Sequence, residues 1–550
     1  MIAKMLHLDL ICVVAERERT LTELRFLGVV HLDLAAASGA EVVSLKGELA
    51  DAERAVRIIQ RVRKETSCGE PVRAALSVAD VLSAAERRET LKSEVDALAR
   101  EIKIYEPYGD FDPALAKKLL DRGIDLHDRL PERLPTMRLS EMQAKMSGLL
   151  AEVASVERCL ATADDRAILA LYPGLQDAMA FAAAKELAAE KGEVAVLSGW
   201  VPARQMSALK ARVAACGWGV LLREPAADEQ PPTLIEPPRL FRPMTSLFAG
   251  LGIAPAYSEA DVSVPFMCYF SLFFAMLVGD GAYGAIFLLG TLAARKVLPR
   301  SWFVLLTVFS ASTVLWGVLS NTWFGAALPF LKGLPTVAWL ADPSYANMML
   351  LCFTIGVSHL MLARIWNGIC RLPDSTAFAE FGWAGVLLMM YLVTNSIVGI
   401  FPAFPTWGLV VGGISVLSVF LFTVKPSELK TRGAELGMLP LNIMSALGDI
   451  ISYVRLFAVG LASVKVAENF NNMALDLVRG DGEWWVKALL SLAMVAILVF
   501  GHVLNLAMAG LSILVHAVRL NTLEFSNHKG ITWSGYQFKP FKKIKVKEKT

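Results

Sequence analysis

The sequence has 550 residues, of which 55% are hydrophobic, and its mean hydropathy of +0.48 is too high for a soluble protein of this length. Charged residues make up 19% of the chain, which is too many for a protein that lies wholly inside a membrane. The formal net charge of +2, without a basic aromatic patch, gives no reason to expect a nucleic-acid partner. We therefore expect a charged, water-exposed half followed by an apolar membrane half.

The first half, residues 1–235, is predicted to be a cytosolic domain. The seven cysteines of the chain are scattered and form no CxxC pair, which indicates reduced thiols and a cytosolic environment. The N-terminus, "MIAKMLHLDLICVVAERER", has no charged segment followed by a long apolar run, so we expect no cleaved signal peptide.

Two α/β lobes joined by helices are predicted for this domain. "MLHLDLICVV" alternates as a strand does, and "GEVAVLSGWVPARQMSALKARVAACGWGVLLREP" reads as strand, turn, helix and strand. Between them, apolar residues recur every three or four positions in 42–59, 91–105 and 142–160, which predicts an antiparallel coiled-coil arm. An ordinary helical bundle is the alternative. Residues 236–263 form a Pro-rich junction.

Eight apolar runs follow, at about 264–278, 281–294, 302–320, 346–366, 377–401, 408–424, 436–475 and 484–519. The first two are either one long helix or a broken pair, since only Gly279, Asp280 and Gly281 separate them. The tail 520–550 carries seven lysines and should be cytosolic like the first half, which requires an even number of crossings. Eight crossings also place the basic loops inside. We expect an α-helical membrane protein with helices 1–6 in 264–424 and helices 7–8 in 436–519.

The last two runs are unusually long. Forty residues of α-helix measure about 60 Å, against a hydrocarbon core of about 30 Å. Such helices must tilt steeply, bend or protrude.

Arg455 lies near the middle of the seventh run, in "LGDIISYVRLFAVGLA". A charge at this depth is costly and usually functional. Its neighbours on the same helix face are small, so another helix can approach the guanidinium closely: Gly448, Ser452, Ala458, Val459 and Ala462. Further polar residues suggest an ion route around this fixed cation: Ser445, Asp449, Ser463, Glu468, Asn505, Ser512 and His516. Taken singly, each polar residue could instead bond to a neighbouring helix, lie at the interface or face water.

Arginine stays protonated at physiological pH, so it cannot relay a proton. It can draw a carboxylate into the charged form, so that a carboxyl group moving past it gives up H⁺ or Na⁺. The sequence offers no carboxylate clearly poised opposite Arg455. An acid of the same chain buried against Arg455 would contradict this interpretation.

These segments resemble the membrane stator subunit of rotary V/A-type ATPases, called subunit a or subunit I. The match covers nearly the whole chain. It is carried by the Arg455 helix, by "MAGLSILVHAVRLNTLEF", by the GD-x-x-YG of "SLFFAMLVGDGAYGAIFLL", by "VLSGWVPA" and by the junction "PTLIEPPRLFRPMTSLFAGLGIAPAYSEADVSV". The resemblance places the family's second arginine at Arg519. Eukaryotic relatives carry a glutamate ten residues earlier, where this chain has Ala509.

The resemblance implies two ion half-channels beside a rotating proteolipid ring, separated by Arg455, and coupling of H⁺ or Na⁺ movement to ATP hydrolysis or synthesis. The other implied partners are peripheral-stalk subunits, a central-stalk cap subunit and the lipid bilayer of the cell's inner membrane. The ion, the direction and the ring stoichiometry stay open.

Other classes of protein fit less well. G-x-G-x-x-G at 279–284 lies in apolar sequence without a βαβ unit, and there is no GxxxxGK[ST] motif, so we expect no catalytic site on this chain and no cofactor. No metal-ligand spacing appears among the seven histidines. A stand-alone secondary ion transporter with a cytosolic regulatory domain is the alternative, although no internal repeat supports it.

Overall fold

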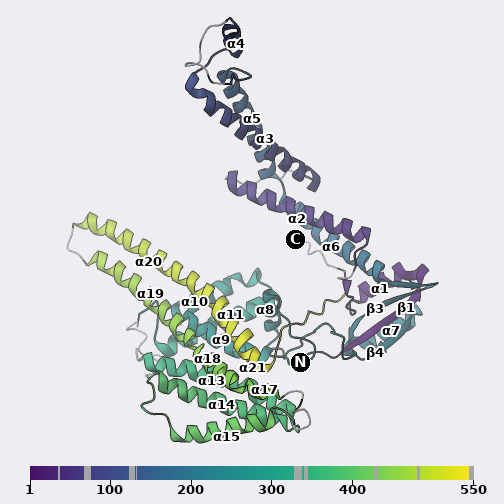
Figure 1. Cartoon of the computed structure of the whole chain (residues 1–550), viewed down its shortest axis with the longest axis vertical. Helices are drawn as coiled ribbons and strands as arrows, with labels where there is room; N and C mark the ends of the chain where they lie inside the picture. The colour runs from purple at the N-terminus through teal and green to yellow at the C-terminus, as the bar shows by residue number, and fades with distance from the viewer. Residues whose placement is uncertain are drawn as a thin grey trace. The chain divides into compact units, whose positions relative to one another are not determined.

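A computed structural model describes residues 1–34, 37–66, 76–122, 131, 133–326, 337, 339, 345–425, 430, 433–479 and 483–543. The chain forms two compact units. The sheet-and-arm unit comprises Met5–Pro225 and the segment from Lys539 onward, and the helical unit comprises Met1–Lys4 and Ala226–Phe538. Figure 1 labels their elements.

The sheet-and-arm unit contains one antiparallel sheet with the strand order β2-β3-β1-β4. Its strands are β1 (Met5–Val13), β2 (Ala189–Lys191), β3 (Val194–Pro202) and β4 (Gly219–Arg223). Strand β1 lies between β3 and β4. The alternating apolar residues of β1 enter a core shared with helices α1 (Arg17–Leu27) and α7 (Met206–Cys216). Strands of both predicted lobes thus lie in one sheet, and the structure does not confirm two separate α/β lobes.

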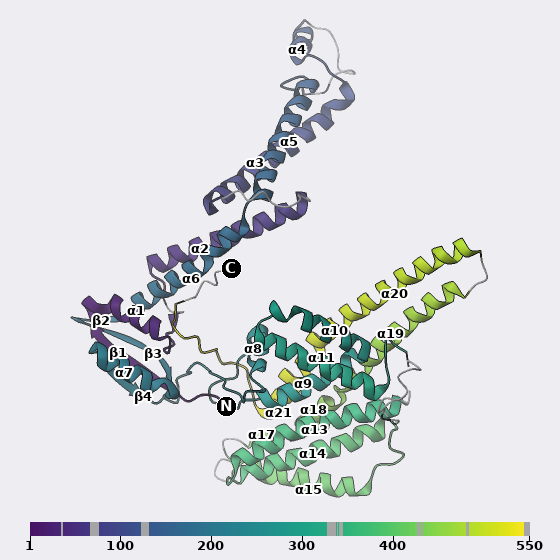
Figure 2. The same ribbon diagram turned by 180° about the vertical axis from the view of Figure 1, so that it is seen from behind.

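Four helices form the arm: α2 (Ala40–Thr66), α3 (Val78–Tyr105), α5 (Leu139–Thr162) and α6 (Asp165–Leu187), with α4 (Pro113–Asp121) between α3 and α5. They pack as two antiparallel pairs, α2 with α6 and α3 with α5 (Figure 2). Predicted seam residues are buried in three of them: Val42, Val56, Ile59, Leu91, Leu98, Met142, Val153 and Leu160. Sequence analysis did not identify α6.

An ion cluster around the buried side chain of Arg88 joins three helices of the arm. The guanidinium of Arg88, on α3, donates to Glu65 of α2 at 2.5 Å and to Glu157 of α5 at 2.8 Å. Lys92 also contacts Glu157, at 2.8 Å. Burial raises the pKa of Glu157, but the hydrogen bonds from Lys92 and Arg88 outweigh burial, so its pKa is lowered overall. The cluster therefore fixes where the two helix pairs meet.

Glu157→Gln is expected to lower the hydrogen-exchange protection of the arm at pH 7 by about 1 kcal/mol, because an ionic hydrogen-bond acceptor is lost. A carboxyl group with a lowered folded pKa stabilises the fold above its unfolded pKa, and this contribution disappears as the pH falls through the folded value. The difference between variant and wild type should therefore shrink below about pH 4. Glu152 lies on α5 like Glu157, but its ion pair with Arg87 of α3 is exposed. Glu152→Gln should therefore change the hydrogen-exchange protection little. An equal effect of both variants would contradict a special role for Glu157.

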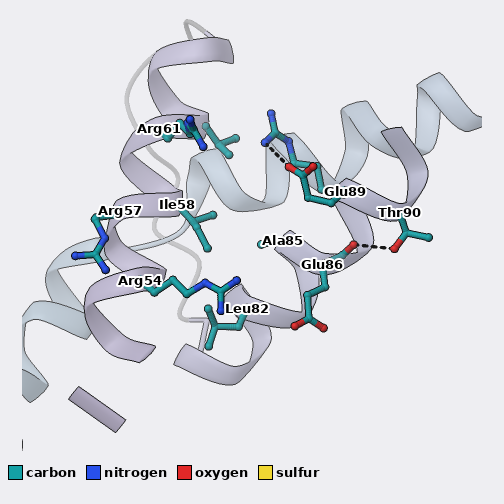
Figure 3. A pocket seen from close by; sticks show the side chains of 11 residues that line it. Arg54, Arg57, Ile58, Arg61, Leu82, Ala85, Glu86, Glu89 and Thr90 are labelled. Carbon is teal, nitrogen blue, oxygen red and sulfur yellow. Dashed lines mark hydrogen bonds and ion pairs between the residues drawn. The ribbon is translucent and has the colours of Figure 1, made fainter. Parts of the chain in front are cut away.

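An open groove of about 710 Å³ lies between α2 and α3 (Figure 3). Ile58, Leu82 and Ala85 form part of its apolar surface, which Figure 3 shows between the two helices. The α2 wall carries Arg54, Arg57 and Arg61, and the α3 wall carries Glu86, Glu89 and Arg88. The α2 wall of this charged groove is therefore cationic, whereas the α3 wall carries charges of both signs.

The helical unit contains α8 (Pro243–Leu251), α9 (Ser263–Val278), α10 (Gly281–Ala293), α11 (Arg300–Ser320), α13 (Tyr345–Arg371), α14 (Thr376–Ile397) and α15 (Thr406–Phe422). Short α17 (Ala434–Gly437) precedes α18 (Leu439–Ile451) and α19 (Val454–Val478). The last span consists of α20 (Trp484–Ser512), π-helical segments Ile513–Ala517 and Leu520–Phe525, and α21 (Ser526–Lys529). All eight predicted apolar runs are helical.

Among the described residues, six helices are long and apolar enough to cross a membrane by length and composition. One of them is α6, in the sheet-and-arm unit, where Ile168 and Ala182–Ala184 are buried. The chain bends by 119° between helices α9 and α10, and α15 is shorter, at 17 residues. The apolar run at 264–294 is thus two helices, and the count of eight crossings is not confirmed.

Asp280 fixes the break between α9 and α10. It is 1% exposed, and its carboxylate accepts hydrogen bonds from the backbone N–H groups of Ala282 at 2.8 Å and Gly325 at 2.7 Å. Gly279 adopts a φ of 69°, which favours glycine. The GD of the GD-x-x-YG signature therefore ends one helix and caps the next.

Of the two long runs, the second extends further than the sequence predicted. The first, Leu439–Val478, has the predicted 40 residues, shifted by three positions, with a turn at Ser452 and Tyr453. The last span runs from Trp484 to Lys529, 46 residues or about 69 Å. It thus continues ten residues beyond Arg519, where we had placed the start of the basic tail.

Three stretches of the helical unit, each adjoining a connection to the other unit, are hydrogen-bonded to one another. Ala3 donates to the Leu234 carbonyl at 2.8 Å, and Glu236 donates to the Met1 carbonyl at 2.8 Å. Phe538 donates to the Thr233 carbonyl at 3.0 Å. We call these stretches, 1–4, 233–236 and 534–538, the three-strand junction.

Candidate functional site

Arg455 is the second residue of α19, which begins just after the turn at Ser452 and Tyr453. Its Nε donates to the Ser452 carbonyl at 2.8 Å, and its Nη2 donates to Glu524 Oε1 at 2.5 Å. Its side chain is 23% exposed and that of Glu524 is 6% exposed. The guanidinium thus lies at the edge of the helical unit, fixed by its own helix and by the last span.

The π-helical backbone brings Glu524 to this position. In an α-helix, residues five apart lie about 140° away from each other, whereas a π-helix bonds residue i to i+5 and stacks such pairs. Leu520–Phe525 is π-helical. Arg519 Nε accordingly lies 3.6 Å from Glu524 Oε1, and the Arg519 side chain is 55% exposed. One carboxylate therefore lies between two arginines.

This pairing contradicts part of the sequence analysis. We had found no carboxylate poised opposite Arg455 and had taken such an acid in the same chain as evidence against a rotary role. Glu524 is such an acid, so the expectation that no carboxylate lies opposite Arg455 was wrong. The geometry of Arg455 alone therefore does not decide between a rotary subunit and a transporter.

A second ion cluster adjoins the first. Asp449 Oδ2 lies 3.0 Å from His528 Nε2. Arg364 Nε donates to His528 Nδ1 at 3.1 Å, and Arg364 Nη1 donates to Glu380 at 3.1 Å. Since Nδ1 accepts a bond from a permanent cation, Nε2 carries the proton and donates to Asp449. Asp449 is thus paired rather than simply facing water.

A separate polar group lies further along the two long helices. Ser463 Oγ donates to Asn505 Oδ1 at 3.2 Å, and Asn505 Nδ2 donates to the Ser463 carbonyl at 2.8 Å and to the Tyr283 hydroxyl at 3.1 Å. The Tyr283 hydroxyl lies 2.7 Å from His502 Nδ1. Eight residues, or about 12 Å of helix, separate Arg455 from Ser463. The structure therefore divides the predicted polar residues into two groups.

The other predicted residues join neither group. Glu468 pairs with Lys465 at 2.7 Å on an exposed helix face. Ser445 is exposed and Ser512 is half-buried. Within the described residues, His516 Nδ1 is buried without a hydrogen-bond partner.

The helix faces near Arg455 are largely exposed, since few other parts of the described chain pack against them. Ala458 and Ala462 are exposed, and a Cβ at Gly448 would meet nothing within 4 Å among the described residues. In the most apolar 18-residue stretch of the last span, only 11% of the residues are buried. The predicted stripe of small residues is thus free to meet lipid or another helix.

Sequence reasoning missed Glu524, His528 and Tyr283. The first two lie beyond the predicted end of the last helix, and Tyr283 was noted only as part of a motif. Among the described residues, no group of three His, Cys, Asp or Glu side chains could hold a metal ion.

Comparison with known proteins gives a consistent set of relatives, although no family model matches the chain. V-type ATP synthase subunit I of Borreliella burgdorferi is 33% identical over 371 residues, which are 64% of this chain and 60% of that protein. V-type ATP synthase subunit I 1 of Treponema pallidum is 28% identical over 98% of this chain and 100% of its own length. A-type ATP synthase subunit I of Methanocaldococcus jannaschii is 24% identical over 75% of this chain and 64% of its own length. The chain thus spans about 60% of the first relative and all of the second.

Proposed function

We propose that this chain, which is similar to subunit I of V-type and A-type ATP synthases, is a multi-pass membrane subunit of a rotary ATPase and forms the ion half-channels of its stator. In this proposal, a proteolipid ring turns against the exposed faces of α18, α19 and the last span. Arg455 separates the half-channels and couples H⁺ or Na⁺ movement to ATP hydrolysis or synthesis. The observation that carries the proposal is the uncovered face of small residues beside Arg455, formed by Gly448, Ala458 and Ala462, which leaves room for a helix of another subunit.

The two polar groups suggest which residues serve each half-channel. Asp449 and Ser452 lie with Arg455, Arg519 and Glu524, and Asn505 and Ser463 lie with Tyr283 and His502. Since about 12 Å of helix separates the groups, we propose that they line different half-channels. The two long spans would lie tilted along the ring.

Disulfide crosslinking tests the docking face. A cysteine at Ala462 should form a bond with a cysteine on the outer helix of the proteolipid, because the Ala462 side chain is exposed. A cysteine at Ala474, which is buried on the same helix, is the matched control and should not react. Equal yields at both positions, or none at Ala462 in the assembled complex, would contradict a ring on this face.

The sheet-and-arm unit is proposed to be cytoplasmic, as is the C-terminus, and to bind peripheral-stalk subunits and a central-stalk cap subunit. The charged groove of Figure 3 supports the stalk contact, because an acidic edge of a stalk helix would match the three arginines of its α2 wall. Arg54→Glu should then reduce stalk crosslinking in the complex, whereas Arg122→Glu, outside the groove, should not. Unchanged crosslinking in the Arg54 variant would exclude this surface. ATP chemistry is assigned to other subunits.

A stand-alone ion transporter is the second candidate, and the Glu524–Arg455 pair favours it. This pair supplies the intramembrane carboxylate that a complete ion site on one chain requires. Purification separates the two functions. A rotary subunit should co-purify with a proteolipid ring and move no ions alone in liposomes, whereas a transporter should purify alone and be active there.

A further inference from the structure

Glu524 is the one acid beside Arg455 among the described residues, and the proposed function does not explain it. In that function, Arg455 must be available to a carboxylate on the ring. In the chain alone, Glu524 occupies it at 2.5 Å. Glu524 is 5% exposed as a residue, so water does little to screen its charge.

Each member of the Arg455–Glu524 pair keeps a polar atom without a hydrogen-bond partner among the described residues. Glu524 Oε2 is buried and accepts no hydrogen bond from the described residues. Among the same residues, no hydrogen bond from Arg455 Nη1 is found, so this nitrogen could donate to a second carboxylate. A single hydrogen bond joins Arg455 to Glu524, so a competing carboxylate could displace Glu524 without breaking a bidentate pair.

The net charge of the cluster favours an anion as the competitor. Two arginines and one carboxylate leave one positive charge in the cluster. An incoming carboxylate brings the cluster to two cations and two anions. Arg519 Nε already lies 3.6 Å from Glu524 Oε1, so Glu524 keeps a cation when Arg455 turns to the newcomer.

We propose that Glu524 is a positioning residue that holds Arg455 as a resident counter-ion, yields it to the carboxylate of the passing ring, and is then retained by Arg519. This proposal rests on the proposed function. It gives the two arginines different roles: Arg455 meets the ring, and Arg519 holds Glu524 in place.

A double-mutant cycle in inverted membrane vesicles containing the whole complex tests this exchange. In Glu524→Gln, unpaired Arg519 adds a second cation that traps the ring carboxylate. In Arg519→Gln, Glu524 stays bound to Arg455. Each single variant should lower ATP-driven ion pumping per assembled complex about tenfold, whereas the double variant, with the original net charge, should recover most of it. Asp476→Asn, at the exposed pair with Arg479 on α19, is the matched control and should pump normally.

Three results would overturn the proposal: normal pumping by Glu524→Gln, losses that multiply in the double variant, or a loss of assembled complex with normal pumping per complex. If Arg455→Ala also pumps normally, the proposed function itself fails. If only Arg455→Ala is inactive, the exchange alone is wrong.

Discussion

Replacement of Arg455 by alanine is expected to abolish ATP-driven ion pumping while the complex still assembles. The side chain is 23% exposed at the edge of the helical unit, so its loss should cost function more than folding. The Arg455→Lys variant should also be inactive. Lysine keeps the charge but lacks the planar guanidinium that donates to Ser452 and Glu524 at the same time. Pumping in inverted vesicles, divided by the amount of complex, measures the effect.

Arg479→Ala is the matched control for this experiment. Arg479 lies at the far end of the same helix and forms an exposed pair with Asp476, so its loss should leave pumping unchanged. Wild-type pumping by the Arg455 variant, at a normal amount of complex, would rule out a role for this arginine in the ion route.

Gly460→Ala is expected to destabilise the helical unit by about 1–3 kcal/mol, because the new methyl group overpacks the crossing of α19 and α9. Its Cβ would lie 2.4 Å from the carbonyl oxygen of Met276, and a backbone oxygen cannot rotate away. The expected sign is the opposite of the usual one, since alanine is normally the more stable residue in a helix. Thermal unfolding of the purified full-length chain measures the change.

Gly413→Ala provides the comparison, on α15. A Cβ there would meet nothing within 4 Å among the described residues, so this variant should be neutral or slightly stabilising. Two variants with the same change in unfolding temperature would show that the α19–α9 contact is looser than its geometry indicates.

Hydropathy and motifs predicted much of the helical unit. The run at 302–320 corresponds to Arg300–Ser320, and the glycines around Asp280 marked a real break between helices. Apolar periodicity is a local property, and local properties are visible in one sequence. The sheet was harder, because the residues of β1 pair with residues 181 to 216 positions away, and nothing in the sequence of β1 identifies its partner strands.

The candidate site was predicted only in part. Arg455 and its small neighbours were evident, since a charge in an apolar run is conspicuous. Glu524 was not, because a reading with 3.6 residues per turn places it away from Arg519, and only the π-helical segment aligns them. His528 was missed because the hydropathy of the last run falls after Arg519, although the helix continues to Lys529.

The three-strand junction has a mechanical consequence. The polypeptide passes between the two units three times, after Lys4, after Pro225 and after Phe538. A single tether swivels freely about its bonds, whereas three strands clamped to one another by backbone hydrogen bonds must shear those bonds before they can twist. The crossing after Pro225 joins the main parts of both units covalently, whereas the crossings after Lys4 and Phe538 connect only residues 1–4 and the segment from Lys539 to the opposite unit. A load applied to the arm would thus reach the helical unit through one covalent path and through two that depend on non-covalent contacts such as the hydrogen bonds of the junction.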